Sequence, residues 1–389
     1  MKVLMINSVC GIRSTGRICT DIAEELEKQG HDVKIAYGRE TVPEKYQKYA
    51  VRIGTDLDVK LHGIKTRLFD RHGFGSKRAT KKFIKWVEEY DPDVIHLHNL
   101  HGYYINIKIL FDYLKKANKK VVWTLHDCWA FTGHCTHFSL ASCEKWKTEC
   151  KCCPNKKEYP RSNLLDNSKK NYVCKKSLFT GIKNMMLVTP SEWLKDLVKQ
   201  SFLSDYEVKC IHNGIDLNAF RPTESDFKKR NDLEDKKVVL AVSSVWNERK
   251  GFYDVIKLSE QLTSDYKVVM VGLDDAQKNS LPPNIIGITR TNSTTELAEI
   301  YSAADVFVNL TYEDNYPTVN LEALACGTPV ITYKTGGSVE SVDVYNQVDQ
   351  GDVSAVARKI VNGEYEKNID HDLYCSIEDF AKECVKIYE

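Results

Sequence analysis

The sequence predicts an α/β protein with two domains, each built on a mostly parallel sheet with helices on both faces. The first observation is the length of 389 residues, which is more than one hydrophobic core usually serves. The second is the alternation of short β-rich runs with longer amphipathic stretches, which occurs in both halves. The third is the polar, turn-rich segment "HNGIDLNAFRPTESDFKKRNDLEDKK" between the halves, which we interpret as a linker.

The first half supplies strands and helices in alternation. "KVLMINS" reads as a strand, a helix follows from Asp21 to Gln29 and ends at Gly30, and "DVKIAYG" is the next strand. The runs "DVIHLHN", "KVVWTLHD" and "NMMLVTPS" repeat the strand pattern, with helical material such as "INIKILFDYLKKANKK" between them. We therefore predict a Rossmann-like domain over residues 1–215.

The second half repeats this rhythm. "KVVLAVSS", "YKVVMVGL", "IIGITR", "DVFVNLT" and "TPVITYK" are strand candidates, and "NSTTELAEIYSAA" and "PTVNLEALACG" are intervening helices. This predicts a second Rossmann-like domain over residues 216–373, and we expect the last helix, 374–389, to pack back on the first domain. The two domains are expected to face each other across a cleft. Open α/β sheets bind ligands beyond the carboxyl ends of their strands, so we expect the functional residues directly after the strands.

Composition places the chain among globular proteins, with 42% hydrophobic and 28% charged residues. The opening "MKVLMINSVC" reads as a strand and lacks the long apolar region of a signal peptide, so we expect a cytoplasmic protein with mostly reduced cysteines. Charge is split: residues 1–215 carry 37 Lys and Arg against 24 Asp and Glu, and residues 216–389 carry 18 against 30. The basic half is suited to a phosphate, a polyanion or an anionic membrane, and the alternative is a pair of ordinary solvated surfaces.

The segment "TYEDNYPTVNLEALACGTPVI" concentrates acidic residues after a predicted strand. Pro317 is well placed to begin a helix, so the backbone N–H groups from Tyr316 to Val319 can form an anion site for phosphate. Asp314 and Glu322 flank this site, and carboxylates accept hydrogen bonds from sugar hydroxyls. We interpret the segment as a socket for a phosphorylated sugar. The alternative is that Asp314 only caps the helix and Glu322 is an ordinary surface residue.

Other strand ends carry further polar candidates. "SVWNERKG" supplies Arg249 and Lys250, whose charges suit a diphosphate, and "TLHD" supplies His126 and a loop-orienting Asp127. Gly11 and Gly16 bracket the turn "CGIRSTGR", where a ligand can approach the backbone closely and where Arg13 and Arg17 can meet phosphate. The spacing is not Gly-x-Gly-x-x-Gly, so a nicotinamide dehydrogenase is poorly supported.

An acidic residue, seven intervening positions and then Glu-Ala-x-Ala-x-Gly-x-Pro-Val resembles the signature of the retaining glycosyltransferases of family 4, polysaccharide-biosynthesis type, which have the GT-B fold. The resemblance also covers "GIRSTGR", "HLHN", "TLHD", "HNGID" and "WNERKG", so it extends over nearly the whole chain. The first acid falls on Asp314, where the family usually has Glu, and Glu313 is one place too early. This departure leaves open which of the two contacts the donor hexose.

The resemblance implies a role for each matching residue. Glu322 is expected to bind the nucleotide ribose, and Asp314, or Glu313 in its place, the transferred sugar. Arg249 and Lys250 are expected to grip the donor diphosphate, and His126 to lie near the transferred sugar. The catalytic set is His126, Arg249, Lys250 and Asp314, and the donor-binding set is Gly16, Glu313, Asn315, Tyr316, Pro317, Thr318, Val319 and Glu322. Family 4 enzymes generally need no divalent metal for transfer, so no catalytic cofactor is expected.

Seven of the thirteen cysteines fall between Cys128 and Cys174. Four of them have a C-x7-C-x6-C-x2-C spacing that suits tetrahedral zinc, namely Cys135, Cys143, Cys150 and Cys153. His134, His137 and Cys152 are rival ligands. A structural zinc, free thiols and disulfides all remain open interpretations. The insert follows "TLHD" directly, so we expect it to shape the acceptor side of the cleft.

The segment "KLHGIKTRLFDRHGFGSKRATKKFIKW" from Lys60 onward is rich in Lys and Arg with apolar residues interspersed. It suits a peripheral position on the anionic inner face of the cell membrane, and the alternative is an exposed charged helix. The family resemblance implies transfer of a sugar from a nucleotide-sugar donor to a glycan or polyprenyl-diphosphate-linked acceptor of a surface or capsular polysaccharide. Rival interpretations are a GT-B nucleotide-sugar epimerase and a zinc-containing nucleic-acid-binding protein. The second lacks aromatic stacking motifs, so we expect no nucleic-acid partner.

Overall fold

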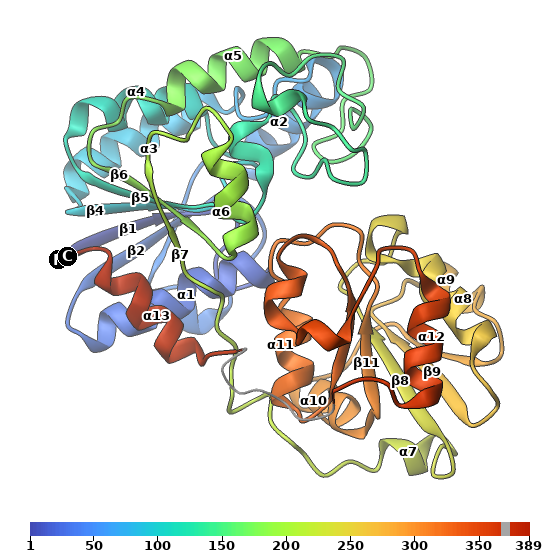
Figure 1. The fold of residues 1–389 in the computed structure, drawn as a ribbon. Coiled ribbons are helices and arrows are strands. Elements are labelled where there is room, and N and C mark those ends of the chain that lie inside the picture. Colours follow the sequence, from blue (N-terminus) through green and yellow to red (C-terminus); the bar gives the residue numbers. More distant parts are fainter. Residues whose placement is uncertain (367–373) are drawn as a thin grey trace. The chain divides into compact units, whose positions relative to one another are not determined.

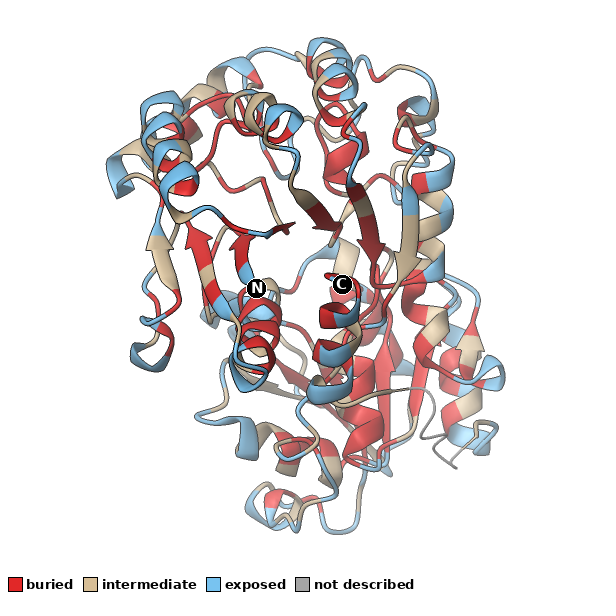
Figure 2. Cartoon of the chain, turned by 90° about the vertical axis from the view of Figure 1, so that its left-hand side faces the viewer, coloured by how far each residue is buried: buried red, intermediate tan, exposed pale blue. Residues whose placement is uncertain are grey.

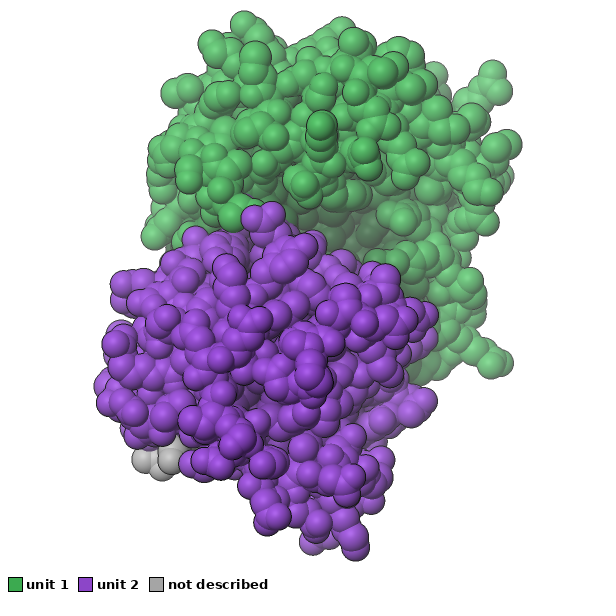
Figure 3. Space-filling model, turned by 90° about the vertical axis from the view of Figure 1, so that its right-hand side faces the viewer, with its two compact units in different colours: residues 1–211, 378–389 green, residues 212–377 purple. Residues whose placement is uncertain are grey.

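The computed structural model describes residues 1–366 and 374–389, and its chain forms two compact units. The first unit comprises residues 1–211 and 378–389, and the second comprises 212–377 (Figure 3). The division falls a few residues before the expected boundary at 215, because Ile215 belongs to the second unit: its N–H donates to the carbonyl of Cys375 at 3.0 Å, and its carbonyl accepts from Ile377 at 2.9 Å. The last helix of the chain returns to the first unit.

A seven-stranded parallel sheet forms the centre of the first unit, in the order β3-β2-β1-β4-β5-β6-β7. Its strands are β1 (Lys2–Ile6), β2 (Asp32–Tyr37), β3 (Ala50–Arg52), β4 (Val94–Leu97), β5 (Lys120–Thr124), β6 (Met185–Thr189) and β7 (Glu207–Cys210). Its helices are α1 (Arg13–Lys28), α2 (Asp56–Phe69), α3 (Lys77–Tyr90), α4 (Ile107–Ala117), α5 (Ser168–Phe179), α6 (Glu192–Lys199) and α13 (Ile377–Lys386). Helices lie on both faces of this sheet (Figure 1).

Each face of the first sheet is covered because its strands are apolar on both sides, as parallel strands usually are. On one face, α3, α4, α5 and α6 contribute side chains such as Phe83, Phe111 and Phe179 to a core around Trp123. On the other face, the segment that follows α13 contributes Tyr388, whose hydroxyl lies 2.6 Å from Nδ1 of the buried His96 on β4. The central strands are largely buried, as the red strands in Figure 2 show, whereas the edge strands β3 and β7 are intermediate or exposed.

The second unit has a six-stranded parallel sheet in the order β10-β9-β8-β11-β12-β13. Its strands are β8 (Lys237–Val242), β9 (Tyr266–Val271), β10 (Ile285–Ile288), β11 (Val306–Asn309), β12 (Val330–Tyr333) and β13 (Gln347–Val348). Its helices are α7 (Phe227–Arg230), α8 (Phe252–Gln261), α9 (Asp275–Asn279), α10 (Thr294–Ala303), α11 (Thr318–Ala325) and α12 (Val353–Asn362). Two cores, one on each face, pack these helices onto the sheet.

Two expectations about local structure were wrong. The segment 212–237 is not a free linker, because Phe220, Phe227 and Leu233 are buried in a core of the second unit. The residues between these three are mostly polar, so the sequence of the segment gives no sign that the three apolar side chains are buried in one core. Helix α1 begins at Arg13, well before Asp21, because Gly11 takes a left-handed φ of 70° and turns the chain directly from β1 into the helix.

The strand orders fix where ligands should bind. In each sheet the first three strands are added in one direction from the middle, and the later strands are added in the other direction. The order therefore reverses between β1 and β4 in the first sheet and between β8 and β11 in the second. Loops that leave the carboxyl ends of such a neighbouring pair diverge, and the space between them is the usual ligand site of open α/β sheets. In the second sheet these are the loops that carry Lys250 and Asp314.

Candidate functional site

The loops that follow β8 and β11 are bound to each other in the second unit. The carbonyl of Arg249 accepts the N–H of Tyr312 at 2.8 Å and the hydroxyl of Thr311 at 3.2 Å. In return, the Arg249 guanidinium donates to the carbonyl of Glu313 at 2.9 Å. The two loops therefore form one frame at the switch point of the second sheet.

Gly251 allows the two loops to lie this close together. It has a φ of 72°, and a Cβ built on it would lie 2.1 Å from the carbonyl oxygen of Leu310. Both the left-handed backbone and the missing side chain are therefore required here. The preceding turn, Glu248–Lys250, is capped by Asn247, whose side chain accepts the N–H of Lys250 at 3.0 Å.

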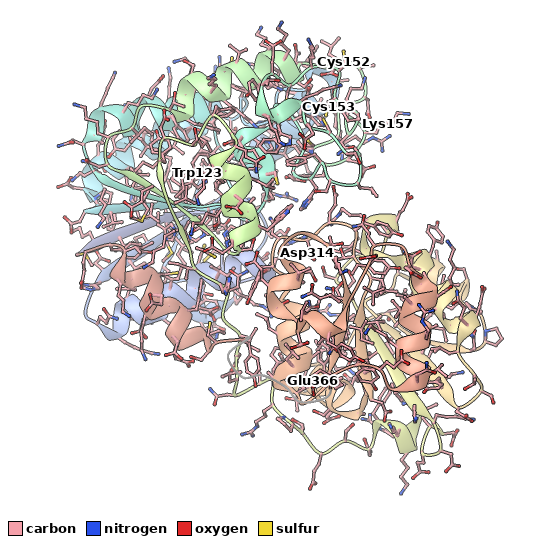
Figure 4. The ribbon with its side chains drawn as sticks, in the orientation of Figure 1. Trp123, Cys152, Cys153, Lys157, Asp314 and Glu366 are labelled. Carbon is pink, nitrogen blue, oxygen red and sulfur yellow. The ribbon has the colours of Figure 1, made fainter. Side chains whose placement is uncertain are left out.

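Lys250 and Asp314 meet at the centre of this frame. The Lys250 ammonium lies 2.5 Å from Oδ2 of Asp314, and both side chains are partly accessible to solvent. Asp314 lies in the loop between β11 and α11 (Figure 4). Glu313, the neighbouring acid, is buried instead. Of the two carboxylates, Asp314 is thus the one placed beside a cation at an accessible position.

The residues that lead into α11 are mostly buried. Asn315, Tyr316 and Pro317 have low exposure, and the Tyr316 ring stacks on His212 with centroids 4.6 Å apart. Pro317 occupies the N-cap position and Thr318 is the first helical residue, so the expectation that Pro317 begins the helix was wrong by one position. Its extended backbone directs the chain into the helix, whose first turn contains the half-buried Thr318 and Val319.

The start of α11 is fixed by a buried polar network. The Asn320 side-chain oxygen accepts from Asn309 of β11 at 2.8 Å, and its amide donates to the hydroxyls of Ser338 at 3.1 Å and Ser341 at 3.0 Å. All four residues are in the second unit. The N–H groups in the first turn of a helix have no intrahelical acceptor and favour anions. This network holds that turn in one position.

Glu322 lies one turn further along α11 and is half-buried. Its Oε2 accepts the hydroxyl of Tyr301 at 3.0 Å, and the Tyr301 ring is fully buried in the core of this unit. Burial, followed by the charge of Glu322, raises the pKa of Tyr301 well above its usual value, so the hydroxyl remains a donor. Sequence reasoning missed Tyr301, because no pattern links it to a carboxylate 21 positions away.

In the first unit, His126 follows β5 and contacts a second histidine. Its Nε2 lies 3.0 Å from Nδ1 of His98, and the two rings are stacked with centroids 5.3 Å apart. Burial is the main cause that lowers the pKa of His126 to about 4, although Asp127 opposes it. The imidazole is therefore neutral near pH 7.

Asp127 orients the same loop. Its Oδ1 accepts the N–H of Trp129 at 2.8 Å, and its Oδ2 pairs with Nε2 of His101 at 2.7 Å. Burial acts to raise the pKa of Asp127, but the charge and hydrogen bond of His101 outweigh it and lower the pKa to about 2. Sequence reasoning did not single out His101, although it lies in the strand-end run "HLHNLHG". A cavity of about 10 Å³ is lined by His98, His101, His126 and Asp127.

The turn after β1 is held by its two glycines and carries an ion pair. The Gly11 N–H donates to the carbonyl of Gly16 at 3.0 Å, and a Cβ on Gly16 would lie 3.0 Å from Val9, so this glycine lets the start of α1 pack closely on the turn that follows β1. Arg13 forms an exposed ion pair with Glu40 at 2.8 Å. Arg17 is exposed on α1.

The structure thus brings Lys250 and Asp314 together and places Arg249, Glu313 and Glu322 on the same frame. His126 and Gly16 belong to the other unit. The four candidate zinc ligands, Cys135, Cys143, Cys150 and Cys153, lie in the insert between β5 and α5. No helix within residues 1–366 or 374–389 combines the length and apolar character that crossing a membrane requires.

Comparison with known proteins identifies relatives along the whole chain. The chain is similar to the putative colanic acid biosynthesis glycosyl transferase WcaC of Escherichia coli, with 25% identity over 386 residues and 92% of each chain covered. It also resembles the putative teichuronic acid biosynthesis glycosyltransferase TuaC of Bacillus subtilis, with 29% identity over 187 residues, covering 45% of this chain and 47% of TuaC.

Solved structures share the fold. HepE of Anabaena in complex with UDP superposes with a TM-score of 0.68 at 14% identity, covering 100% of this chain and 99% of HepE. Sucrose-phosphate synthase of Thermosynechococcus elongatus gives a TM-score of 0.66 at 16% identity, covering 100% of this chain and 94% of that one. The expected GT-B class, with two Rossmann-like parallel-sheet units, is confirmed.

Two family descriptions match consecutive parts of the chain. The group described as "Glycosyl transferases group 1" matches residues 223–372, which form most of the second unit. The group described as "Glycosyltransferase Family 4" matches residues 15–219, which are more than half of the chain. The protein is therefore a glycosyltransferase and belongs to glycosyltransferase family 4.

Proposed function

We propose that this protein is a retaining glycosyltransferase of surface or capsular polysaccharide synthesis. In this proposal it transfers a sugar from a nucleotide-sugar donor to a glycan or polyprenyl-diphosphate-linked acceptor. The observation that carries the proposal is the Lys250–Asp314 pair, held by the interlocked loops at the switch point of the second sheet. The names of WcaC and TuaC support a role in polysaccharide synthesis, and the HepE structures with UDP and UDP-glucose support the donor class.

The donor diphosphate is assigned to Lys250, Arg249 and the first turn of α11. Cations and free backbone N–H groups are the usual ligands of a diphosphate. Lys250 is already paired with Asp314, so donor binding exchanges one anionic partner for another. Asp314 then becomes available to accept a hydrogen bond from a hydroxyl of the transferred sugar. Glu322, oriented by Tyr301, is assigned to the ribose hydroxyls.

The proposed chemistry is a front-face displacement, as the family resemblance implies. The bond between the anomeric carbon and the diphosphate oxygen breaks as the acceptor oxygen approaches from the same face. The acceptor hydroxyl gives its proton to the departing phosphate oxygen, and the new glycosidic bond keeps the anomeric configuration. Lys250 and Arg249 stabilise the charge that develops on the diphosphate, which is where this chain contributes most to catalysis.

His126 is assigned to the transferred sugar on the side of the first unit. Its imidazole is neutral near pH 7 because burial lowers its pKa to about 4. A neutral imidazole recognises a hydroxyl as donor or acceptor and does not compete with the cations for the diphosphate. His98, stacked on it, limits the rotation of the ring.

The acceptor is proposed to reach the protein at an anionic membrane surface. Helix α2 exposes Leu57, Leu61 and Ile64 at helical spacing, beside the exposed Lys60 and Arg67. The insert extends this apolar surface: Leu164 and Leu165 are exposed, and the backbone at 163–165 is hydrogen-bonded to the end of α2, with distances of 2.7 Å to the Arg67 carbonyl and 3.2 Å to the Leu68 carbonyl. We call these five apolar residues the α2 patch.

Vesicle co-sedimentation tests the membrane proposal. The protein should sediment with vesicles that contain phosphatidylglycerol and remain in solution with vesicles of phosphatidylcholine alone, because Lys and Arg near an anionic surface each contribute about 1 kcal/mol. The double variant L61S/I64S should lose most of this binding. V344S is the control, because Val344 is an apolar side chain of the second unit that is even more exposed than Leu61 and Ile64. Equal sedimentation with both vesicle types would remove the membrane from the proposal.

A thermal-shift screen against nucleoside-diphosphate sugars tests the donor assignment. A ligand present at 100 times its Kd stabilises the native state by about 2.7 kcal/mol, which is a measurable rise in Tm. We expect one or a few UDP-, GDP- or TDP-sugars to give this rise, without added divalent metal, and Lys250→Ala to abolish it. If no nucleotide sugar shifts the wild-type protein, the donor assignment is wrong.

Product analysis separates the rival functions. A nucleotide-sugar epimerase would convert the donor in the absence of acceptor, whereas a transferase should leave it intact apart from slow hydrolysis. A nucleic-acid-binding protein would shift DNA or RNA in a salt-dependent manner. The anomeric configuration of the transferred product, determined by NMR coupling constants, decides between retention and inversion.

A further inference from the structure

The insert between β5 and α5 gathers four cysteines around one small cavity. Cys135, Cys143, Cys150 and Cys153 all line it, together with His134. Its volume of about 10 Å³ is close to the space of a single small sphere. The insert contains only short 3-10 turns, η2 (Cys128–Phe131) and η3 (Lys145–Lys147), so regular secondary structure does little to hold it. Figure 4 shows Cys152 and Cys153 in these loops.

Three of the four sulfur atoms have polar partners. The side chains of Cys135 and Cys153 are hydrogen-bonded to each other. The backbone N–H of Gly133 donates to Sγ of Cys150 at 3.3 Å. A Cβ on Gly133 would lie 2.8 Å from the Cys150 Cβ, so the glycine lets its N–H approach this sulfur. Such N–H donors stabilise negative charge on sulfur.

A buried lysine supplies positive charge next to the same cysteines. Lys175 of α5 is fully buried, and its ammonium donates to the carbonyls of Trp129 at 2.7 Å and Thr132 at 3.1 Å. Among the charges that act on this group, those of Cys150 and Cys135 come first, although burial outweighs them and lowers the pKa of Lys175 to about 7. A buried ammonium is costly unless an opposite charge lies nearby. Four thiolates around one divalent ion carry a net negative charge, which Lys175 would offset.

His134 points to a metal independently. Its Nδ1 lies 2.5 Å from Oδ1 of the buried Asp70, and within the part of the chain described here its buried Nε2 has no hydrogen-bond partner. A carboxylate that fixes one ring nitrogen and leaves the other nitrogen available is the arrangement around metal-binding histidines. Because His134 lines the cysteine cavity, it is either a ligand or an immediate neighbour of one.

We propose that Cys135, Cys143, Cys150 and Cys153 bind a single structural Zn²⁺. Thiolate ligands and a closed site favour zinc over hard cations such as Mg²⁺. Tetrahedral coordination needs Zn–S distances of about 2.3 Å. Within the described residues, no three of these sulfurs lie within 4.8 Å of one another, so binding would draw the turns of the insert inward around the ion.

The ion would brace the loop that leaves β5. The carbonyl of Cys135 accepts the hydroxyl of Thr132 at 2.5 Å, and the N–H of Cys128 donates to the carbonyl of Thr136 at 3.0 Å. These bonds join the cysteine cavity to the turn that begins with Asp127. Metal at the four cysteines would therefore stabilise the segment that carries His126 and Asp127, without taking part in the transfer reaction.

Metal analysis of the purified protein tests the proposal directly. The protein should be produced without a metal-affinity tag and analysed by inductively coupled plasma mass spectrometry. We expect about one zinc per chain, and much less in Cys143→Ser and Cys150→Ser. Cys152→Ser is the matched control: Cys152 is exposed and adjacent to Cys153, so this variant should keep its zinc. His134→Ala should keep the metal, because all four proposed ligands are thiolates; loss of the metal in this variant would overturn the four-cysteine ligand set.

Two further readouts keep the test decisive if a variant fails to fold. Wild-type protein in which Co²⁺ replaces the zinc should show the sulfur-to-cobalt charge-transfer band and the strong ligand-field absorption of a tetrahedral thiolate site. Thiol titration of native protein should show the four cysteines protected until a chelator is added. Zinc-free wild-type protein, or a disulfide between Cys135 and Cys153 in protein prepared without reductant, would overturn the proposal.

Discussion

Replacing Tyr301 by Phe tests whether a buried hydroxyl orients the carboxylate of Glu322. The change removes one oxygen atom and keeps the ring that fills the core, where Tyr301 is fully buried. The hydroxyl donates to Glu322 Oε2 at 3.0 Å. Hydrogen bonds to charged groups contribute about 1.5–3 kcal/mol. Glu322 is half-buried, so water can replace part of this loss, and we expect a cost near the lower end of that range.

This cost should appear in nucleotide binding if Glu322 contacts the ribose. A loss of about 1.4 kcal/mol corresponds to a tenfold increase in Kd. Isothermal titration of the nucleoside diphosphate of the donor found in the thermal-shift screen into the wild-type protein, Tyr301→Phe, Glu322→Gln and the double variant forms a double-mutant cycle. We expect a coupling energy of about 1 kcal/mol between the two positions. Tyr253→Phe is the control, because Tyr253 belongs to the same unit and is largely exposed. Additive effects would show that Tyr301 does not act through Glu322.

Three further changes test other parts of the structure. Lys250→Ala should lower kcat/KM about 10²–10³-fold with an unchanged circular dichroism spectrum, as removal of one charge-stabilising donor does in other enzymes; near-normal turnover would contradict the role of the ammonium. Gly251→Ala should lower the free energy of unfolding by more than about 2 kcal/mol in urea titrations, because it adds a collision with Leu310 to the left-handed strain. Gly363→Ala has a similar φ of 68° and nothing within 4 Å of the new Cβ, so it should cost only about 1 kcal/mol, and equal losses would refute the collision. Burial lowers the pKa of His126 to about 4 and that of His96 to about 3, so the unfolded chain takes up protons first as the pH falls below the ordinary value of 6.5. The two histidines should therefore not affect the Tm above pH 6.5, and they should make it fall between pH 6.5 and about 4. A constant Tm across this window would contradict the lowered pKa values.

The alternating pattern of the sequence was enough to predict both sheets and most strands. Runs such as "KVVLAVSS" are apolar throughout because parallel strands are covered on both faces, and this signal is local. Short edge strands were missed, including β3 and β13, which have three and two residues. The segment 212–237 was misread because its buried residues are widely spaced and belong to a core that only forms with α10 and α11.

Residues of the site were predictable where they stand next to a strand end. Lys250, Asp314 and His126 follow β8, β11 and β5, so one rule about parallel sheets selects all three. Partners that come from elsewhere in the chain were not predictable in this way. Tyr301 reaches Glu322 from α10, and His101 reaches Asp127 from the loop after β4, and both contacts depend on side-chain directions that only the folded chain defines.

The docking of α13 means that the second unit is inserted within the sequence of the first. On the ribosome, residues 1–211 emerge early but lack the C-terminal segment, whose Tyr388 contacts His96 and is made only after the whole second unit. One face of the first sheet therefore lacks its C-terminal segment until the second unit has been synthesised. Removing the final two residues of the chain would leave the second unit untouched and would expose a histidine buried 292 positions earlier in the sequence.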